Sequence, residues 1–479
     1  MNKQDNLKDK QPPSITPRAV FGLRSDVKEN VQFFAPDKCA YLAGNYVVIT
    51  SIKDKVQNFF PANHENGEIT GFAVDENQSY IMLGIAQKGE KPKITLQFIN
   101  KTDFLIEENK TKKLVTSDEI ETGDHFLSLA LNLSKGYIIA LVGPKAQSII
   151  VYQHEYRSCI TKFHSNWKLL NATIYKQISI NPLNPYYFSV FGDGGFALCR
   201  FNDAEKRNPD RVEVNSTTAN YQEFNIYILN FVSCCWLSKT RIALLNSSCD
   251  VFILDYGRKF EAPLKKVIKG VNIFESQSKG KAIFSKNFNI YVTRDDGIII
   301  KLEEKQQSDK VINYERVQNA TKFVQNLPRM EVHHLSINHT SSSGIFISTE
   351  TSQLYYVELL NDNSLSDGNN FKHFLCSFHS EEITYLDVSK IKQLVVTCSK
   401  DKTIRIWNYL NLQLEVVQEF EEDATHVSFH PNGLHLAVGF RDSLKLMNIL
   451  EKSIIVYKEF PISGIKDVIY FLKYFIILF

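Results

Sequence analysis

The sequence predicts an all-β protein of the β-propeller class, in which small four-stranded sheets, the blades, stand around a common axis. Residues that strands favour are abundant, with 33 Phe and 21 Tyr among 479 residues. A unit made of an alternating strand, a turn, a very apolar strand, a second turn and a third strand recurs about every 40 to 55 residues, the spacing of propeller blades. No sustained amphipathic helix or heptad pattern interrupts this series.

The repeated unit can be read in nine places. One such sheet cannot bury both of its faces, so the units must stack into a closed array. Seven units are clear and those at 38–52 and 281–303 are weaker. In chain order the units cover 38–52, 69–99, 126–153, 175–201, 231–257, 281–303, 332–359, 383–409 and 424–449.

The order of the units divides the chain into three parts. Residues 1–18 are polar and contain Pro, which predicts a disordered leader and not a secretory signal. Residues 19–378 hold enough units for a first propeller of about seven blades. Residues 379–479 begin a second propeller but hold too few units for a ring, which needs about four to eight blades. We therefore expect a truncated second propeller, and the alternative is one larger, irregular ring.

The last segment, GIKDVIYFLKYFIILF (464–479), is apolar and lacks the expected turn. Its apolar run from Val468 holds about twelve residues with Lys473 inside, whereas a membrane-spanning helix needs about 20. We favour an unfinished blade strand, or an end altered by lost coding sequence, over a membrane anchor.

The charge balance limits the classes of partner. Lys and Arg number 55 and Asp and Glu number 53, a net charge of +2, which excludes a general attraction to nucleic acid or membrane but allows a local basic patch. None of the eight Cys forms a C-x-x-C pair, and most lie in apolar runs. We expect buried, reduced thiols in a reducing cytoplasmic compartment, and neither a bound metal nor a cofactor.

The clearest blade contains CSKDKTIRIWN (398–408). It resembles the WD-repeat family, whose blades bury a hydrogen-bonded set of His, Ser or Thr, Asp and Trp. Here that structural tetrad is His379, Thr397, Asp401 and Trp407, at the family's spacing. A buried indole N–H needs an acceptor, and the tetrad supplies one while it ties the turn to the strands. No other unit keeps the full set, and Met447 stands where the next unit would carry Trp.

A hydroxyl, a His and an Asp also suggest a hydrolase triad. The structural interpretation is favoured because Asp401 lies in a tight turn and no loop nearby could form an oxyanion hole.

Two further patterns have simple structural interpretations. FGDGGF (191–196) lacks the Lys-Ser/Thr of a phosphate-binding loop and predicts a turn between strands. His333, His334 and His339 lack an acidic or Cys partner at ligand spacing, so a metal site is not expected. No catalytic residues are predicted.

A basic stretch, GRKFEAPLKKVIKG (257–270), carries five cations. It predicts either a solvated loop between blades or a contact for an acidic surface such as the tails of tubulin. The candidate basic patch is Arg258, Lys259, Lys265, Lys266 and Lys269.

Several short stretches of the sequence resemble one particular family, beyond the general pattern of the repeat. They are AVFGLRSDVKENVQFF (19–34), AQKGEKPKITL (86–96), FHPNGLHLAVGFRDSLKLMNIL (429–450) and the blade at 383–409. Together they resemble the cilia- and flagella-associated protein 57 family, WD-repeat proteins of motile cilia, from about residue 19 to about residue 459. The first word is the most specific, because a propeller does not require it.

The resemblance implies a role. Members of the family typically have two propellers followed by a long coiled coil, lie on axonemal doublet microtubules and help to assemble or regulate inner dynein arms. This chain departs from them by lacking the rest of the second propeller and the coiled coil. A partial gene model, a short paralogue and an incomplete isoform all account for that departure.

Three functions remain open from the sequence. The first is a non-enzymatic axonemal scaffold that binds inner dynein arm proteins or their regulatory complexes, with tubulin as a further candidate partner and without nucleic acid or membrane. The second is a general cytoplasmic WD-repeat adaptor in ciliary transport, ribosome assembly or ubiquitin ligation. The third is a propeller enzyme, which would need clustered carboxylates or metal ligands around a central channel.

Overall fold

A computed structural model gives the structure. It describes residues 17–62, 67–75, 80–87, 89–99, 112–115, 124–132, 137–145, 147–155, 160–168, 174–184, 186–193, 195–202, 213–218, 230–255, 264–268, 278–286, 289–295, 298–306, 312–316, 321–322, 332–337, 344–358, 372–471 and 474–478. The predicted leader therefore lies outside the described residues except for Pro17 and Arg18.

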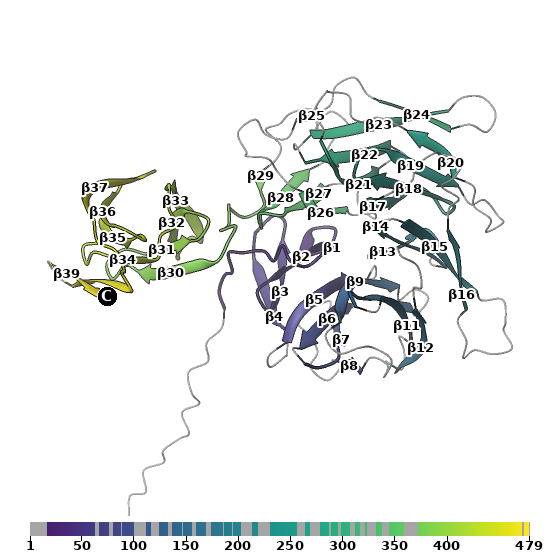
Figure 1. Ribbon diagram of the computed structural model, residues 1–479, viewed down its shortest axis with the longest axis horizontal. Helices are drawn as coiled ribbons and strands as arrows, with labels where there is room; N and C mark the ends of the chain where they lie inside the picture. Colours follow the sequence, from purple (N-terminus) through teal and green to yellow (C-terminus); the bar gives the residue numbers. More distant parts are fainter. Residues whose placement is uncertain are drawn as a thin grey trace, which may run out of the picture.

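Seven antiparallel sheets form the larger part of the molecule, here called the first ring (Figure 1). Six have four strands in sequential order, and the sixth sheet has a fifth, short strand, β25, paired with β23. The first four sheets are β1(Val31–Ala35), β2(Lys38–Ala43), β3(Tyr46–Ser51), β4(Gln57–Pro61); β5(Gly67–Val74), β6(Tyr80–Gln87), β7(Lys93–Phe98), β8(Lys112–Val115); β9(His125–Asn132), β10(Tyr137–Gly143), β11(Ser148–Glu155), β12(Ile160–Lys168); and β13(Ile174–Ile180), β14(Tyr187–Asp193), β15(Gly195–Asn202), β16(Glu213–Thr218). The other three are β17(Phe231–Trp236), β18(Arg241–Asn246), β19(Val251–Asp255), β20(Leu264–Ile268); β21(Gly280–Lys286), β22(Asn289–Arg294), β23(Ile298–Gln306), β24(Ile312–Arg316), β25(Thr321–Lys322); and β26(Val332–Ile337), β27(Gly344–Thr349), β28(Leu354–Glu358), β29(Lys372–His373).

The first ring is closed by contact between its seventh and first sheets. The first strand of each sheet lies against that of a neighbour, and β26 lies against β1. A buried apolar cluster joins Tyr41 and Val48 of the first sheet to Phe346 of the seventh. The Ser348 hydroxyl donates to the Asn30 side-chain oxygen at 2.8 Å across the same seam. Each sheet of the ring therefore has a neighbour on both faces, as a propeller requires.

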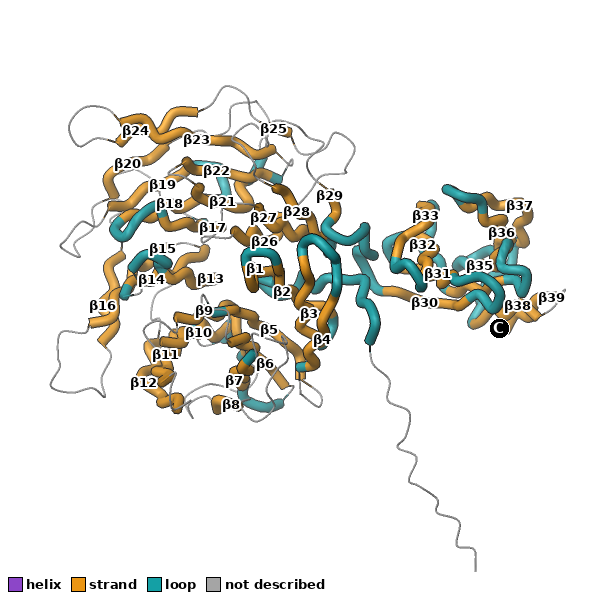
Figure 2. Tube along the Cα trace, turned by 180° about the vertical axis from the view of Figure 1, so that it is seen from behind, coloured by secondary structure: helices purple, strands orange, loops and turns teal. Residues whose placement is uncertain are grey.

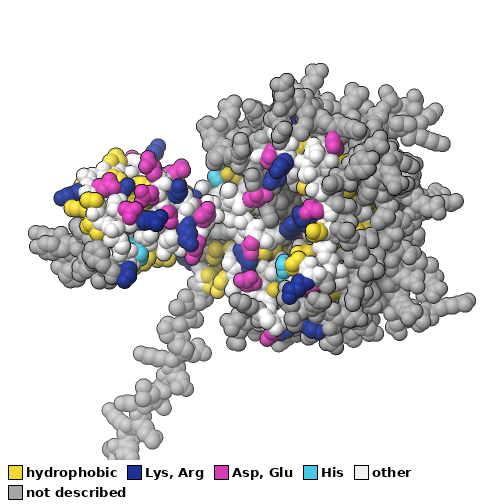
Figure 3. Space-filling model, in the orientation of Figure 1, with side chains coloured by type: hydrophobic (Ala, Val, Ile, Leu, Met, Phe, Trp, Pro, Cys, Tyr) yellow, Lys and Arg dark blue, Asp and Glu magenta, His cyan; other side chains and the backbone are white. Residues whose placement is uncertain are grey.

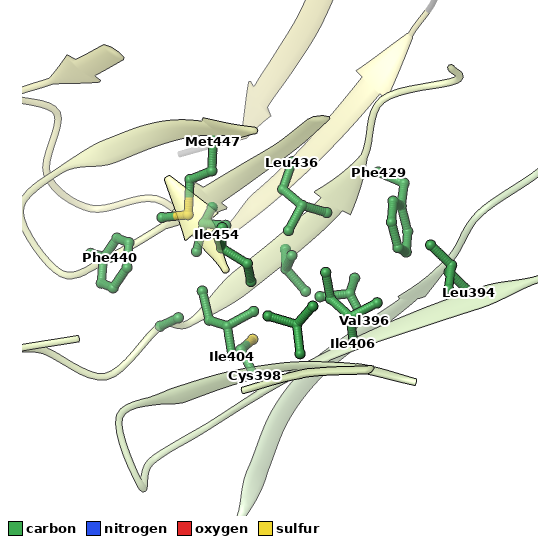
Figure 4. Close-up of a cluster of buried hydrophobic side chains, with 14 residues drawn as sticks. Leu394, Val396, Cys398, Ile404, Ile406, Phe429, Leu436, Phe440, Met447 and Ile454 are labelled. Atoms are coloured by element: carbon green, nitrogen blue, oxygen red, sulfur yellow. The ribbon is translucent and has the colours of Figure 1, made fainter. Parts of the chain in front are cut away.

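Three more sheets follow and form a smaller body beside the ring, here called the C-terminal unit (Figures 1 and 2). They are β30(Ile383–Val388), β31(Leu394–Ser399), β32(Thr403–Asn408), β33(Gln413–Glu419); β34(His426–Phe429), β35(His435–Gly439), β36(Leu444–Ile449), β37(Ile454–Phe460); and the hairpin β38(Asp467–Phe471), β39(Tyr474–Leu478). One buried cluster, which includes Val396, Ile406, Phe429 and Met447, fills the space between the first two of these sheets (Figure 4).

The prediction of an all-β propeller of about seven blades, followed by an incomplete second one, is confirmed. Eight of the nine predicted units fall on the first three strands of one sheet, as 231–257 does on β17 to β19. The fourth, outer strand of each blade had no signal in the sequence. The weak unit at 38–52 corresponds to β2 and β3, and its missing first strand is β1.

The apolar tail pairs as the antiparallel hairpin β38–β39. Among the described residues, no helix has the length and apolar character needed to cross a membrane.

Candidate functional site

The structure brings the four tetrad side chains together in one continuous hydrogen-bonded chain. The Trp407 indole N–H donates to Thr397 Oγ1 at 2.9 Å. Thr397 Oγ1 lies 2.8 Å from His379 Nε2, and His379 Nδ1 lies 2.9 Å from Asp401 Oδ2. The Asp401 carboxylate can only accept, so His379 Nδ1 carries the proton of that bond, and in the neutral imidazole Nε2 is then the acceptor for the Thr397 hydroxyl.

Asp401 is held in a tight turn between β31 and β32. Lys402 adopts a left-handed backbone with φ 62° there, a conformation found at such turns. Asp401 Oδ1 accepts from the Thr403 hydroxyl at 2.7 Å and from the Thr403 backbone N–H at 2.9 Å. Burial by itself would raise the pKa of Asp401, but the hydrogen bonds from His379 and Thr403 outweigh it and hold this pKa well below its usual range.

The tetrad side chains are buried and bonded to one another. The side chains of His379 and Asp401 are almost fully buried, and Thr397 is buried as well. The Thr397 hydroxyl accepts from the indole N–H and is bonded to the imidazole, so it is engaged on both sides within the tetrad. The arrangement can fix a turn against two strands, which is its chemical role.

Sequence reasoning missed further residues that surround the tetrad. Arg405 lies on the same face and donates through Nε to Thr403 Oγ1 at 3.2 Å. Its other end donates to the Ser377 carbonyl oxygen at 2.6 Å, and it stands 3.7 Å from the Asp401 carboxylate. Arg405 therefore joins the tetrad to the chain that arrives from the first ring.

Phe21 covers the outer side of the tetrad. Its ring stacks on that of Trp407, with centroids 4.9 Å apart and planes inclined by 25°. The segment 19–30, which carries Phe21, is fastened to the first sheet of the ring: the Val20 N–H donates to Gln57 Oε1 at 2.9 Å and the Arg24 N–H to the Leu42 carbonyl at 3.0 Å. We call this segment the junction segment, because it contacts both the first ring and the C-terminal unit.

The junction segment contains the word that no propeller requires, FGLRSDVKEN (21–30). This stretch was the one sign in the sequence of the contact, although the sequence did not show that Phe21 would meet Trp407. On the ring side, Gln353 fixes the connecting chain, because its side chain accepts from the Phe378 N–H and donates to the Phe378 carbonyl, both at 2.9 Å. Two contacts therefore join the two parts of the molecule in addition to the connecting chain: Phe21 stacks on Trp407, and Arg405 bonds to Ser377.

A second polar cluster lies inside the first ring (Figure 3 shows the charged side chains on the described part of one face). Glu29, with φ 57°, reaches across from the first sheet to the fourth, where the Gln177 side-chain amide donates to its carboxylate at 2.8 Å. Burial raises the pKa of Glu29 to about 7 against the opposing effects of Gln177 and Lys28. Burial and the nearby Lys176 lower the pKa of Lys28, while Lys176 pairs with Asp193 at 2.6 Å.

The candidate basic patch stays a prediction. Arg258, Lys259 and Lys269 lie outside the described residues. Lys265 and Lys266 belong to β20, where Lys266 is opposite Ile253 and the ladder has a bulge beside it.

The Gly-rich pattern has a clear outcome. FGDGGF forms the hairpin between β14 and β15, where Phe191 pairs with Phe196, so the turn interpretation is confirmed. Gly192 is needed in it because a Cβ there would meet the Ile174 carbonyl oxygen at 2.1 Å. Within the part of the chain that the structure describes, no three His, Cys, Asp or Glu side chains gather as metal ligands. The described cysteines form no disulfide.

The chain has recognisable relatives. The WD40 family (WD domain, G-beta repeat) matches residues 371–408, which contain the whole tetrad. Over 490 residues the chain is 24% identical to cilia- and flagella-associated protein 57 of Mus musculus, which covers 94% of this chain and 37% of the relative. Over 126 residues it is 41% identical to cilia- and flagella-associated protein 57 A of Tetrahymena thermophila, covering 26% of this chain and 10% of the relative.

A solved structure is also similar, the C-terminal WD40 domain of Sif2. It has a TM-score of 0.41 and 10% identity, over 81% of this chain and 97% of that one. The chain spans 37% of the length of its mouse relative.

Proposed function

From its relationship to the cilia- and flagella-associated protein 57 family, we propose that this WD-repeat chain is a non-enzymatic scaffold of the axoneme. It helps to assemble or regulate inner dynein arms on the doublet microtubules of motile cilia. The observation that carries the proposal is the extent of the relationship, 94% of the chain, which includes both the first ring and the C-terminal unit.

The geometry supports a scaffold. The polar set that could be mistaken for a triad is buried and fully used in holding a turn. A rigid ring of sheets presents many loops at once, and several weak contacts on one platform add up to a stable attachment. The partners that we propose are inner dynein arm proteins or their regulatory complexes, with tubulin as a further candidate, and neither nucleic acid nor membrane.

Localisation tests this proposal most directly. A tagged copy expressed in a ciliated cell should stay with the axoneme after detergent extraction, and axonemes that lack the protein should contain less inner dynein arm protein by quantitative mass spectrometry. A uniform cytosolic or nucleolar signal would instead favour the general adaptor in ciliary transport, ribosome assembly or ubiquitin ligation.

The tubulin contact has its own test. Replacing Arg258, Lys259, Lys265, Lys266 and Lys269 with Ser should weaken cosedimentation with microtubules, because acidic tubulin tails attract a local basic patch. The matched control removes five exposed lysines of the C-terminal unit, namely Lys390, Lys402, Lys452, Lys458 and Lys466. Equal losses in both variants would show a general charge effect and remove the patch as a specific site.

A further inference from the structure

A group of polar side chains lies inside the first ring, at one end of its axis. The first strand of each sheet is the inner one, and all seven begin at the same end because the sheets share one order of strands (Figure 1). Glu29 comes just before β1, and Gln177 lies near the start of β13. We call Lys28, Glu29, Lys176, Gln177 and Asp193 the axial cluster.

A hydrogen bond of the axial cluster crosses the interior of the ring. The Gln177 side-chain amide donates to the Glu29 carboxylate at 2.8 Å. The first sheet contacts the second and the seventh, so a bond from it to the fourth sheet spans the axis. Lys28 and Lys176 each directly precede one member of this bonded pair, and the charge of Lys176 lowers the pKa of Lys28. The bond therefore brings two ammonium groups near each other at the axis.

The two lysines differ in their partners. Lys176 Nζ pairs with Asp193 Oδ2 at 2.6 Å, and its side chain is 46% exposed, so solvent reaches it. Lys28 is half-buried and makes no hydrogen bond or ion pair with the residues that the structure describes. Since an ammonium group carries three N–H donors, Lys28 keeps donors for an acceptor that does not belong to this part of the chain.

The charges of the axial cluster favour an anion. Burial raises the pKa of Glu29 to about 7, so near that pH this carboxyl is ionised only in part and Asp193 is the remaining carboxylate opposite two lysines. The Cys234 thiol of β17, which the charge of Glu29 also affects, stays neutral because burial raises its pKa to about 12. Burial lowers the pKa of Lys28, and a bound anion would oppose that effect.

We propose that Lys28 and Lys176 bind an oxyanion between them, beside the bridge that Glu29 and Gln177 form across the axis. The ligand carries negatively charged oxygens because Lys28 offers N–H donors without an acceptor, and charge-assisted hydrogen bonds are the strong ones. Two sources share this chemistry, a free tetrahedral anion and the carboxylate of an acidic polypeptide segment. The site goes beyond the proposed axonemal role and does not depend on it.

Isothermal titration calorimetry of the whole chain at constant ionic strength tests the site. The probes are sodium sulfate and the peptide acetyl-Gly-Glu-Gly-Glu-Gly-amide, with the peptide that has Gln in place of Glu as its control. Lys28→Gln and Lys176→Gln should each weaken binding at least about tenfold, the effect of losing a hydrogen bond from a charged group. Lys281→Gln is the matched control, because Lys281 also lies near the start of a first strand but pairs with Glu350 at 2.9 Å.

The two probes distinguish the sources. Tighter binding of sulfate would identify a free anion, and tighter binding of the Glu peptide, with no binding of the Gln peptide, would identify an acidic segment. A chain that binds neither probe would overturn the proposal. An equal loss in Lys281→Gln would overturn it as well, because it would show a general effect of charge.

The dependence on pH separates binding by these lysines from a purely structural role. The wild type should bind its probe several-fold more weakly near pH 8 than near pH 6, because ionised Glu29 repels an anion held beside it. Glu29→Gln keeps the bridge to Gln177 without the charge and should lose much less affinity over this range. Identical pH profiles in the two proteins would overturn the proposal, and circular dichroism shows that each variant is folded.

Discussion

The first ring and the C-terminal unit use the same four-stranded repeat, but their sheets are stabilised in different ways. In the ring, every sheet lies between two neighbours, and buried apolar clusters fill the gaps. The first sheet of the C-terminal unit has a full neighbour on one face only, and it is the one sheet in the chain whose sequence keeps all four tetrad residues. At the position where that sheet has Trp407, the next sheet has the buried Met447. The difference teaches that apolar packing on both faces is sufficient for the sheets of the ring, whereas the first sheet of the C-terminal unit adds a buried network of hydrogen bonds.

The two regions also contain carboxyl groups with opposite behaviour. Glu29 in the ring has a pKa raised by burial, and Asp401 in the C-terminal unit has a pKa lowered by hydrogen bonds that outweigh its burial. The two regions should therefore respond to pH in opposite directions.

The largest expected effect comes from Trp407→Ala. Truncation of a buried aromatic side chain costs about 3–5 kcal/mol, and it also removes the partner of Phe21. We propose that residues 19–378 fold independently, so calorimetry should show an early transition for residues 379–479 and an unchanged one for the ring. A single cooperative transition of the whole chain would contradict the independence of the two parts.

Asp401→Asn should cost the C-terminal unit about 2 kcal/mol, the usual value for hydrogen bonds to a charged group. The pKa of Asp401 is lower in the folded state than in the unfolded chain, so its stabilising effect is complete above the unfolded value and is lost as pH falls below about 4. Chemical denaturation followed by Trp fluorescence should show this acid sensitivity in the wild type and less of it in the variant. An equal acid response in both would assign it to other groups.

Glu29→Gln should act on the ring and with the opposite sign. The pKa of Glu29 is about 7 in the folded state, above its ordinary value of 4.5, so the stability that its protonated form gives is complete below about pH 4.5 and is lost as pH rises from there to about 7. The amide variant keeps the contact with Gln177 and should be about 1–2 kcal/mol more stable than the wild type near pH 8, with a much smaller difference near pH 5. A constant difference between these two pH values would mean that Glu29 does not titrate in this range.

The smallest effect concerns the contact between the two regions. A double-mutant cycle of Phe21→Leu with Trp407→Phe should give a coupling energy of about 0.5–1.5 kcal/mol for the stacked pair. Phe33→Leu, which removes an aromatic contact inside the ring, is the control and should show no coupling to Trp407. Zero coupling for Phe21 would show that the stacked pair does not hold the two regions together.

A feature of the fold or of the site could be predicted from the sequence when the residues that form it lie close together along the chain. The inner three strands of each blade carry apolar runs that one sequence reveals, as YIIALVG does for β10. The outer strands do not, since a strand such as β33 (QLEVVQE) is exposed along most of its length and mixes polar with apolar residues. The tetrad was legible because its four residues lie at a fixed spacing within one blade.

The remaining site residues could not be predicted from a single sequence. Phe21 meets Trp407, and Glu29 meets Gln177, only after the ring has brought distant segments together. In the sequence Arg405 is an ordinary strand residue, and only the fold shows that it bonds to Ser377. In each case the partner is chosen by tertiary geometry and not by local spacing.

The junction segment has a consequence for how this chain is made. Its contacts, together with that of the adjoining Arg18 with Leu410, join residues as far as 392 positions apart. A ribosome adds about 5–20 residues per second, so Phe21 emerges tens of seconds before Trp407 exists. The contact between Phe21 and Trp407 can therefore form only after residue 407 has been made, when all residues of the seven-sheet ring are already present.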